Sequence, residues 1–321
     1  MSFLIREFDN AKDFENFAKL SFETLVSIKG TPPGMSYQEF FEWAKEWVLD
    51  YIEDLELNKI FVAENDDGNY LGHIWLSLQD ELKPWEFEEY FWIQNITIDN
   101  KFRNQGIGTK LMNHAENWIK RQEVINIGLH VNSESRDAFL LYKTLGYSEY
   151  RTQFINKINP AHKGDNVNEI HNIKNITLNE GLNSLKDMIF KSFEVKMRKK
   201  ASKEIIQTKF NTYIDTLKNK QDENHVFTIL NSDSQPCGYF IISISEWKYK
   251  KSVTIKDIGF ANDSIRARFF PEAYTFIKKW ALNQDISFIE IELSKSQKKL
   301  ANQCKEQGFE MFGCFMEKKL T

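Results

Sequence analysis

The spacing of hydrophobic residues in the first half of the chain changes from strand-like to helix-like and back again. Isoleucines between residues 93 and 98, and alternating apolar residues between 125 and 131, predict two strands. Between these strands, one helix face is predicted by apolar residues at three- and four-residue spacing: Ile107, Leu111, Met112, Ala115, Trp118 and Ile119. A second helix face follows at Ala138, Leu141, Tyr142 and Leu145. Gly146 then stands where a helix end favours a left-handed residue, so a final strand is expected to begin there.

The second half of the chain repeats this order at a constant distance. Trp280 follows Trp118 at the same distance at which Gly308 follows Gly146. Each tryptophan lies in a helix-patterned stretch that leads into an alternating, strand-like stretch. A repeat at a fixed distance is the signature of a duplicated structural unit, so we expect the chain to contain two copies of one fold.

The regions upstream and between the copies support the same division. Residues 60–78 resemble residues 225–244, each with a polar, turn-rich middle that predicts a β-hairpin. Each copy then has the order strand, two helices, antiparallel strands and the strand–helix–strand–helix–strand segment. We therefore predict an α+β fold with domains at residues 1–158 and 170–321, joined by the polar, turn-rich linker 159–169.

The composition is that of a soluble globular protein. The chain has 321 residues, enough for two ordinary domains, with 41% hydrophobic and 27% charged residues. The first residues carry charges throughout, so no signal peptide is expected. No apolar run approaches the ~18 residues that a membrane helix needs. We therefore expect no membrane association.

Cysteine usage and net charge limit the expected cellular location and the expected class of partner. The three cysteines form no CxxC pair and cannot all pair with one another, so reduced thiols and a cytoplasmic location are expected. The formal net charge of -4 argues against a nucleic-acid partner, which would normally meet a basic surface.

A glycine-containing loop separates the first strand from the helix that follows it. Its sequence, residues 103–108, is RNQGIG. Glycines let backbone N–H groups approach a ligand, and the start of the next helix adds the positive end of its dipole, so the loop suits a pyrophosphate. A dinucleotide fingerprint is excluded because Leu111 occupies its third glycine position, and a P-loop is excluded because Gly108 is followed by Thr109-Lys110. An ordinary strand–helix turn is the alternative reading.

The wider pattern resembles the GCN5-related N-acetyltransferase (GNAT) family. The stretches that carry the resemblance are ITIDNKFRNQGIGTKLM, LHV and AFLLYKTLGY, within residues 90–150. The resemblance implies two tandem GNAT-like folds, each a mixed, mostly antiparallel sheet flanked by helices. It implies acetyl-coenzyme A as co-substrate, with no metal ion. The residues that it places around the coenzyme are Ile96, Thr97, Ile98, Arg103, Asn104, Gln105, Gly106, Ile107, Gly108, Thr109 and Ser135.

Two positions depart from the family pattern, and the second copy departs entirely. Asn100 replaces a common proline, and Ser135 stands where asparagine is common, although serine is still a suitable N-cap for the next helix. In the second copy, the counterparts of Gly106 and Gly108 are Arg268 and Phe270, and those of Arg103 and Tyr142 are Ile265 and Cys304. Side chains at Arg268 and Phe270 would keep the pyrophosphate of a coenzyme away from the backbone N–H groups. We expect the second copy to hold no coenzyme and to have a structural role.

Two residues are candidates for proton transfer. The resemblance implies that Tyr142 protonates the leaving thiolate, and a packing tyrosine is the alternative. His130 lies twelve residues before Tyr142, on the strand face opposite Leu129, and is the candidate base. A histidine hydrogen-bonded within the sheet is the alternative. Gln94 occupies a position where many relatives carry a carboxylate, which weakens the assignment of a base to that strand and leaves Glu88 and Glu89 as the fallback candidates.

The acceptor is expected to be a small cationic amine. Residues 30–60 and 80–92 mix aromatic residues with carboxylates, which would suit a cation, although an amphipathic helix with a solvated acidic face is the simpler explanation of the first stretch. The sequence therefore predicts an acetyl-coenzyme A-dependent N-acetyltransferase acting on a small-molecule amine, as a monomer or homodimer. Acetylation of protein N-termini or lysines, and a non-catalytic coenzyme A sensor, are the alternatives.

Overall fold

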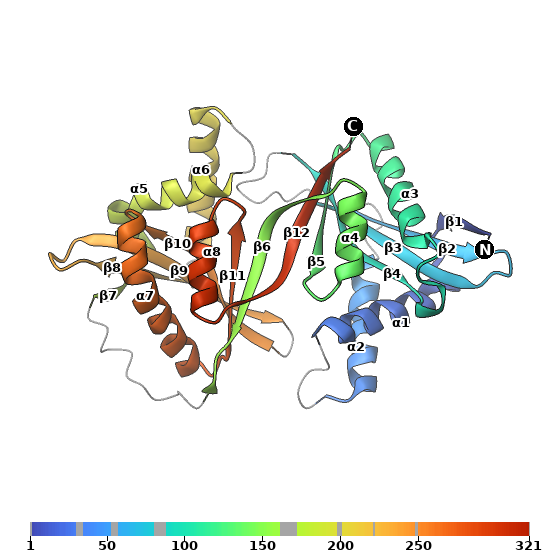
Figure 1. Cartoon of the computed structure of the whole chain (residues 1–321), viewed down its shortest axis with the longest axis horizontal. Coiled ribbons are helices and arrows are strands. Elements are labelled where there is room, and N and C mark those ends of the chain that lie inside the picture. Colours follow the sequence, from blue (N-terminus) through green and yellow to red (C-terminus); the bar gives the residue numbers. More distant parts are fainter. Residues whose placement is uncertain are drawn as a thin grey trace. The chain divides into compact units, whose positions relative to one another are not determined.

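The computed structural model describes residues 2–29, 35–52, 57–79, 88–160, 172–197, 201–220, 222–247 and 250–320. The described residues divide into two compact units (Figure 1). The first unit comprises the described residues up to Glu149 together with those from Phe315 onward, and the second comprises Tyr150–Cys314. No helix in the described part is long and apolar enough to cross a membrane.

The first unit is a sheet with helices packed on it, built in the predicted order. Its elements are β1 (Phe3–Glu7), α1 (Asn10–Lys29), α2 (Tyr37–Ile52), β2 (Asn58–Asn65), β3 (Tyr70–Gln79), β4 (Tyr90–Ile98), the 3₁₀ turn η1 (Asn100–Phe102), α3 (Ile107–Arg121), β5 (Asn126–Asn132) and α4 (Arg136–Thr144). Strands β1 to β4 pair in antiparallel fashion, and β4 pairs with β5 in parallel. The apolar face predicted for residues 107–119 is the buried face of α3.

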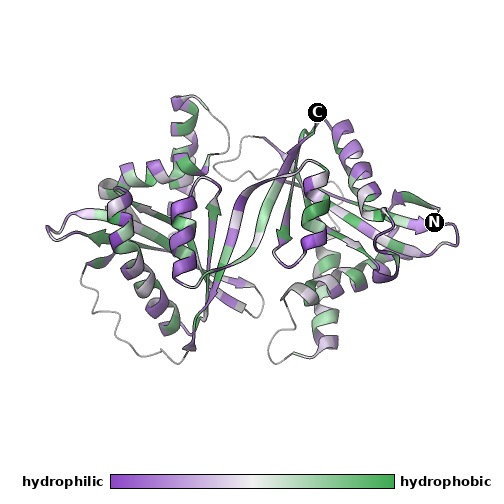
Figure 2. Ribbon diagram, viewed as in Figure 1, coloured by the Kyte–Doolittle hydropathy of each residue, from purple (hydrophilic) through white to green (hydrophobic). Residues whose placement is uncertain are grey.

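The second unit repeats this architecture. Its elements are β6 (Ser148–Lys157), β7 (Ile173–Ile176), α5 (Leu178–Lys196), α6 (Lys203–Asn219), β8 (Asn224–Leu230), β9 (Pro236–Trp247), β10 (Lys250–Phe260), α7 (Asp263–Asn283), β11 (Phe288–Ser294), α8 (Lys298–Glu306) and β12 (Glu310–Lys319). Strands β7 to β10 are antiparallel, and β10 pairs in parallel with β11. Hydrophobic residues are frequent along its strands (Figure 2), and a buried cluster contains residues of β8 to β11, α7 and α8.

The predicted repeat is confirmed down to single paired positions. In the first unit Phe91 of β4 pairs with Ile127 of β5, and in the second their counterparts in the repeat, Val253 of β10 and Ile289 of β11, form the same pair. Strands β5 and β11, helices α4 and α8, and strands β6 and β12 begin and end at positions related by this same constant distance. Both units are therefore built by the same pattern, and the prediction of tandem α+β folds is confirmed.

The two units exchange their last strands, a feature that the predicted boundaries did not include. Strand β6 follows α4 in the chain, yet it belongs to the second unit apart from its first two residues, and it pairs in antiparallel fashion with β11. The last residues of β12 belong in turn to the first unit, beside β5. The observed division after Glu149 and after Cys314 thus differs from the predicted division at residue 158. Most of the predicted linker lies outside the described residues.

The C-terminal segment, residues 315–320, completes the sheet of the first unit. The Leu320 N–H donates to the carbonyl of Ile125 at 2.7 Å. Further along, the Phe315 ring packs on the His130 ring, with 4.9 Å between centroids. The contacts run in opposite directions along the two strands, so the segment is antiparallel to β5. Its apolar side chain at Met316 is fully buried, which explains why this strand stays with the sheet.

An ion pair fixes this segment to helix α3. The Lys318 ammonium lies 2.6 Å from a carboxylate oxygen of Glu116, and the Glu116 side chain is only 9% exposed. The Lys318 ammonium also lies 5.6 Å from the centre of the Tyr147 ring. A carboxylate buried to this extent is stable only with its cation in place, because an unpaired buried charge is costly.

Replacing Lys318 alone should therefore destabilise the first unit. We expect Lys318→Met to lower the free energy of unfolding by about 2–3 kcal/mol, because Glu116 is left buried without its partner. The double variant Glu116→Gln/Lys318→Met should recover most of that loss. Urea unfolding of the single and double variants measures both values, and equal stability of Lys318→Met and wild type would contradict this account.

Candidate active site

The glycine loop leaves the first N–H groups of α3 open to a ligand. Gly106 is the N-cap of α3, with φ +77°, and it offers no side chain to accept from those N–H groups. Asn104 is also left-handed, with φ 62°. A Cβ atom built on Gly106 meets no protein atom within 4 Å, so the space beside it is open. The first turn of α3 carries no acidic residue, so its positive end suits an anion, as the sequence predicts.

Arg103 ties this loop to the end of β4. Its Nε donates to the carbonyl of Ile98 at 3.2 Å, while its side chain is exposed. The bond uses one of the five guanidinium N–H groups, which leaves others for a phosphate. The resemblance places Ile98 at the coenzyme, and its carbonyl already accepts this one hydrogen bond. Gln105 in the loop is exposed, and Thr109 in the first turn of α3 is half-buried.

Strands β4 and β5 part at the point where the predicted coenzyme contacts begin. Their last paired residues are Ile93 and Leu129, although β4 continues to Ile98. Just beyond Ile93, the pairing of β4 with β3 shifts by one residue, so Gln94 forms a bulge. Backbone groups of β4 after the bulge therefore lose their partners on the β5 side. These groups include those of Ile96, which the resemblance assigns to the coenzyme. The backbone groups of Thr97, assigned likewise, face β3 instead, because the Asp99 N–H two residues further on donates to the Leu71 carbonyl of β3.

Helix α4 packs directly against the start of α3. A Cβ atom on Gly108 would lie 3.4 Å from a side-chain methyl of Leu141, which is ordinary van der Waals contact, so Leu141 borders the first turn of α3. The N-cap of α4 is Ser135, as predicted, although its hydroxyl makes no capping hydrogen bond. The hydroxyl of Ser135 is thus not committed to the helix end.

Tyr142 lies next to Leu141 on α4 and is 5% exposed. Burial raises the pKa of its phenol above the ordinary value. Its ring lies 6.0 Å from that of Tyr147. A buried phenol that stays protonated can serve as a proton donor to a bound reactant.

His130 lies in β5 on the face opposite Leu129 and Val131, as predicted. It follows the last position at which β5 pairs with β4. Its Nε2 atom is buried, and its ring packs against Phe315 of the C-terminal segment. The position adjoins the parting of the strands, and the role of base stays a prediction.

Helix α1 approaches the same part of β4 through hydroxyl groups. The Thr24 hydroxyl lies 3.0 Å from that of Thr97, and the Thr97 hydroxyl donates to the side-chain amide oxygen of Asn95 at 2.6 Å. No sequence signal pointed to this contact, because Thr24 and Thr97 lie far apart along the chain. It fixes α1 over the strand positions that follow the bulge.

Helix α2 has the amphipathic pattern that was the simpler reading of its acidic residues. Ser36 and Glu39 form a capping box, since the Ser36 N–H donates to the Glu39 carboxylate and the Glu39 N–H to the Ser36 hydroxyl. Phe40 is fully buried, whereas Glu42 and Glu46 keep part of their surface in solvent. These carboxylates therefore form a solvated face. Much of the second acidic stretch, residues 80–87, lies outside the described residues.

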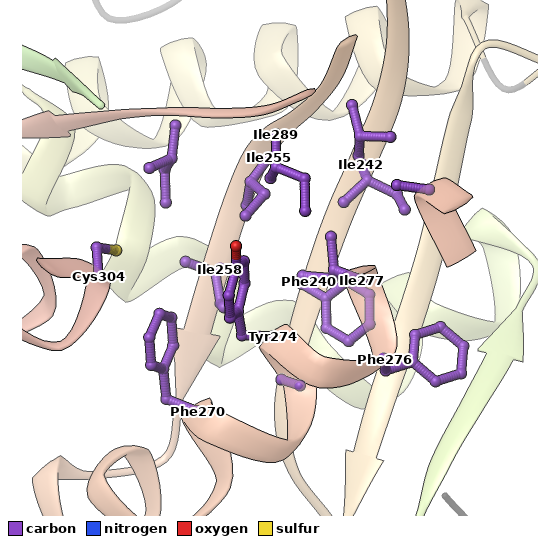
Figure 3. Close-up of a cluster of buried hydrophobic side chains, with 14 of the residues drawn as sticks. Phe240, Ile242, Ile255, Ile258, Phe270, Tyr274, Phe276, Ile277, Ile289 and Cys304 are labelled. Carbon is purple, nitrogen blue, oxygen red and sulfur yellow. The ribbon is translucent and has the colours of Figure 1, made fainter. Parts of the chain in front are cut away.

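The corresponding loop is missing from the second unit. Helix α7 begins at Asp263, which corresponds to residue 101, so helix replaces the turn that precedes α3 in the first unit. The Asn262 side chain caps the helix by accepting from the Ile265 N–H. Phe270, the counterpart of Gly108, points into the buried cluster around Tyr274 (Figure 3). The N–H groups that would bind a phosphate are thus used by the helix itself.

Another open space belongs wholly to the second unit. A cleft of about 380 Å³ is lined there by Asn156, Thr275, Lys278, Lys279 and Gly308, among others. Within the described ranges no group of three or more His, Cys, Asp or Glu side chains could hold a metal ion.

Comparisons with known proteins agree with this geometry. Residues 24–147 match the acetyltransferase (GNAT) family. An uncharacterized N-acetyltransferase of Methanocaldococcus jannaschii is 29% identical over 142 residues, which cover 43% of this chain. The match spans 57% of that relative's length.

Two solved structures share the fold along nearly the whole chain. A GCN5-related N-acetyltransferase from Sphaerobacter thermophilus covers 99% of this chain and 96% of its own, with a TM-score of 0.56 and 15% identity. A tandem GNAT protein from the clavulanic acid biosynthesis pathway covers 100% of this chain and 99% of its own, with a TM-score of 0.51 and 11% identity. At such identities the likeness establishes the fold, and it establishes that fold for both units.

The open space at Gly106 provides a direct test of the loop. Gly106→Trp should raise the Kd for coenzyme A more than tenfold, because the indole would occupy the space beside the first N–H groups of α3. Gly68→Trp is a matched control, since Gly68 has φ +78° and likewise no protein atom within 4 Å of its Cβ. Both variants should lose at least ~1 kcal/mol of stability through backbone strain. Calorimetric titration that finds equal coenzyme affinity in both would refute the loop assignment.

The contrast between the two units predicts the stoichiometry of binding. We expect one acetyl-coenzyme A molecule per chain, because only the first unit has a loop that precedes its helix. Isothermal titration calorimetry measures the number directly. Two sites per chain would show that the second unit binds the coenzyme in another way.

Proposed function

The first copy of this chain, residues 24–147, belongs to the acetyltransferase (GNAT) family, and on that premise we propose that the protein transfers an acetyl group from acetyl-coenzyme A to a primary amine. The observation that carries the proposal is the loop at Gly106, which opens α3 at the point where β4 and β5 have parted. A pyrophosphate and an extended thiol arm fit those two neighbouring features.

The residues present fit the coenzyme. The N–H groups that follow Gly106 and the guanidinium of Arg103 would hold the pyrophosphate, with Asn104 and Gln105 beside it. Backbone groups of Ile96 and Ile98, on the side of β4 that faces away from β3, would hold the arm. Acetyl-coenzyme A supplies a thioester that is already activated. The protein therefore mainly has to position two reactants and stabilise the charge that develops on the carbonyl oxygen.

Proton transfers complete the reaction. The neutral amine attacks the thioester carbonyl, a C–N bond forms, and the C–S bond then breaks. Tyr142 gives its proton to the departing sulfur, and His130 accepts the proton that the amine loses. The raised pKa of Tyr142 suits this role, since the phenol stays protonated throughout the neutral range.

The acceptor is proposed to be a small cationic amine. Because the fold places α1 against β4, and α2 against α1, the amine would reach the thioester from that side of the sheet. A panel of aminoglycosides, polyamines, amino acids and short peptides would identify its class by thiol release. Turnover with peptides and with no other amine of the panel would instead indicate that the protein acetylates proteins.

Removal of the Tyr142 hydroxyl tests the mechanism. We expect Tyr142→Phe to lower kcat about 100-fold while the Kd for coenzyme A stays unchanged, because the ring still packs in place. The wild-type rate should show no loss from ionisation of Tyr142 up to about pH 10, since its pKa is raised. If the Tyr142→Phe variant keeps the wild-type kcat, Tyr142 is not the proton donor.

A further inference from the structure

One face of the first unit's sheet carries the side chains that α1 approaches. Trp75 of β3 packs on Phe17 of α1, with 5.7 Å between ring centroids, so Trp75 marks this face. In the register of β3 with β4, Ser77 lies opposite Trp92, and Ser77 shares the face of Trp75 because it is two residues away. Phe91 packs on the opposite face, against α3. Trp92 therefore lies on the α1 face, immediately before the strands part.

Three aromatic side chains meet on that face at the parting of β4 and β5. The ring centroids of Trp92 and Phe315 are 6.0 Å apart, and those of Phe315 and His130 are 4.9 Å apart. The indole of Trp92 lies over Gly128, where an added Cβ would come within 2.8 Å of it. All three side chains are half-buried, so each keeps part of its surface exposed. They form an aromatic platform, Trp92–His130–Phe315, beside the proposed acetyl position.

A carboxylate lies on the same face. Glu317 is two residues after Phe315 in the antiparallel C-terminal segment, so its side chain is on the side of Phe315 and next to Gly128 in β5. It is half-buried, as Phe315 is. Aromatic faces and a carboxylate together attract an organic cation, and this attraction strengthens as water is excluded.

The charge bound there cannot be that of the reacting nitrogen. An amine attacks the thioester only as the neutral base, and a site that favours its ammonium form raises its pKa and slows the reaction. The aromatic platform and Glu317 instead suit a positive charge that persists throughout the reaction. Such a charge belongs to a second amino group of the acceptor.

We propose that Trp92, Phe315 and Glu317 bind a second, permanently charged ammonium group of the acceptor, so that the preferred substrate is a diamine or polyamine. The inference rests on the proposed function for the reaction itself. It assigns two of the residues that select the substrate, Phe315 and Glu317, to the C-terminal segment at the end of the second copy.

Binding to the protein saturated with coenzyme A tests the inference without turnover. The probes are 1,5-diaminopentane and pentylamine, which differ only in the second amino group, titrated calorimetrically at fixed salt. We expect the diamine to bind at least tenfold more tightly to the wild type. Glu317→Gln and Trp92→Leu should each reduce that ratio to near one, with the Kd for coenzyme A unchanged. Glu310→Gln, an exposed residue in the part of β12 that belongs to the second unit, is the matched charge control and should keep the wild-type ratio.

The outcomes separate this inference from the proposed function. A ratio near one in the wild type, or a ratio that both variants leave unchanged, would overturn the inference. Thiol release from acetyl-coenzyme A, measured in parallel with both amines, tests the reaction. A diamine preference that depends on Glu317, without turnover of either amine, would overturn the proposed function and leave the binding site established.

Discussion

The parting of β4 from β5 is the constraint on which the rest of the first unit depends. Parallel strands normally satisfy one another's backbone groups, and here the pairing stops at Ile93 and Leu129 while both strands continue. Unpaired N–H and C=O groups inside a protein need another partner. The bulge at Gln94 turns the strand, and the glycine loop at its end offers further N–H groups. The fold thus creates a row of backbone donors and acceptors that a coenzyme can satisfy.

The second unit shows that the same strand geometry is not sufficient for a site. Its β10 carries a shift in pairing between Ile255 and Asp257, at the counterpart of Gln94, and β10 pairs with β11 over only three residues. The difference lies in the helix that follows. Its extended N-terminus and the buried ring of Phe270 remove the loop and fill the space. Asp257, beside the shift, is buried and bound by Ser192, Tyr239 and Lys196. At the place where the first unit has its loop, the second unit is thus filled by its own side chains.

Much of the fold could be predicted from sequence because its signals are local. The helix face from Ile107 to Ile119, the turn at Gly146 and the repeat that relates the two copies each follow from spacing alone. The exchanged strands could not be predicted, because the alternation of buried Cys314 and Met316 is the same whichever sheet receives them. The contact between Thr24 and Thr97, and that between Phe315 and His130, also depend on tertiary pairing. The glycine loop and Tyr142 were recognisable, whereas the surroundings of the acceptor were not.

The position of residues 315–320 in the first unit has a consequence for biosynthesis. The ribosome makes these residues after the whole of the second unit, so the first sheet cannot acquire its strand beside β5 until the second unit has been synthesised. Domains of most proteins fold in order as they are made. Here the first unit must wait with one edge of β5 unpaired, and an exposed strand edge invites pairing with other chains. A nascent chain stalled within the second unit would therefore expose the edge at which His130 lies, and would be a natural client for chaperones that shield such edges.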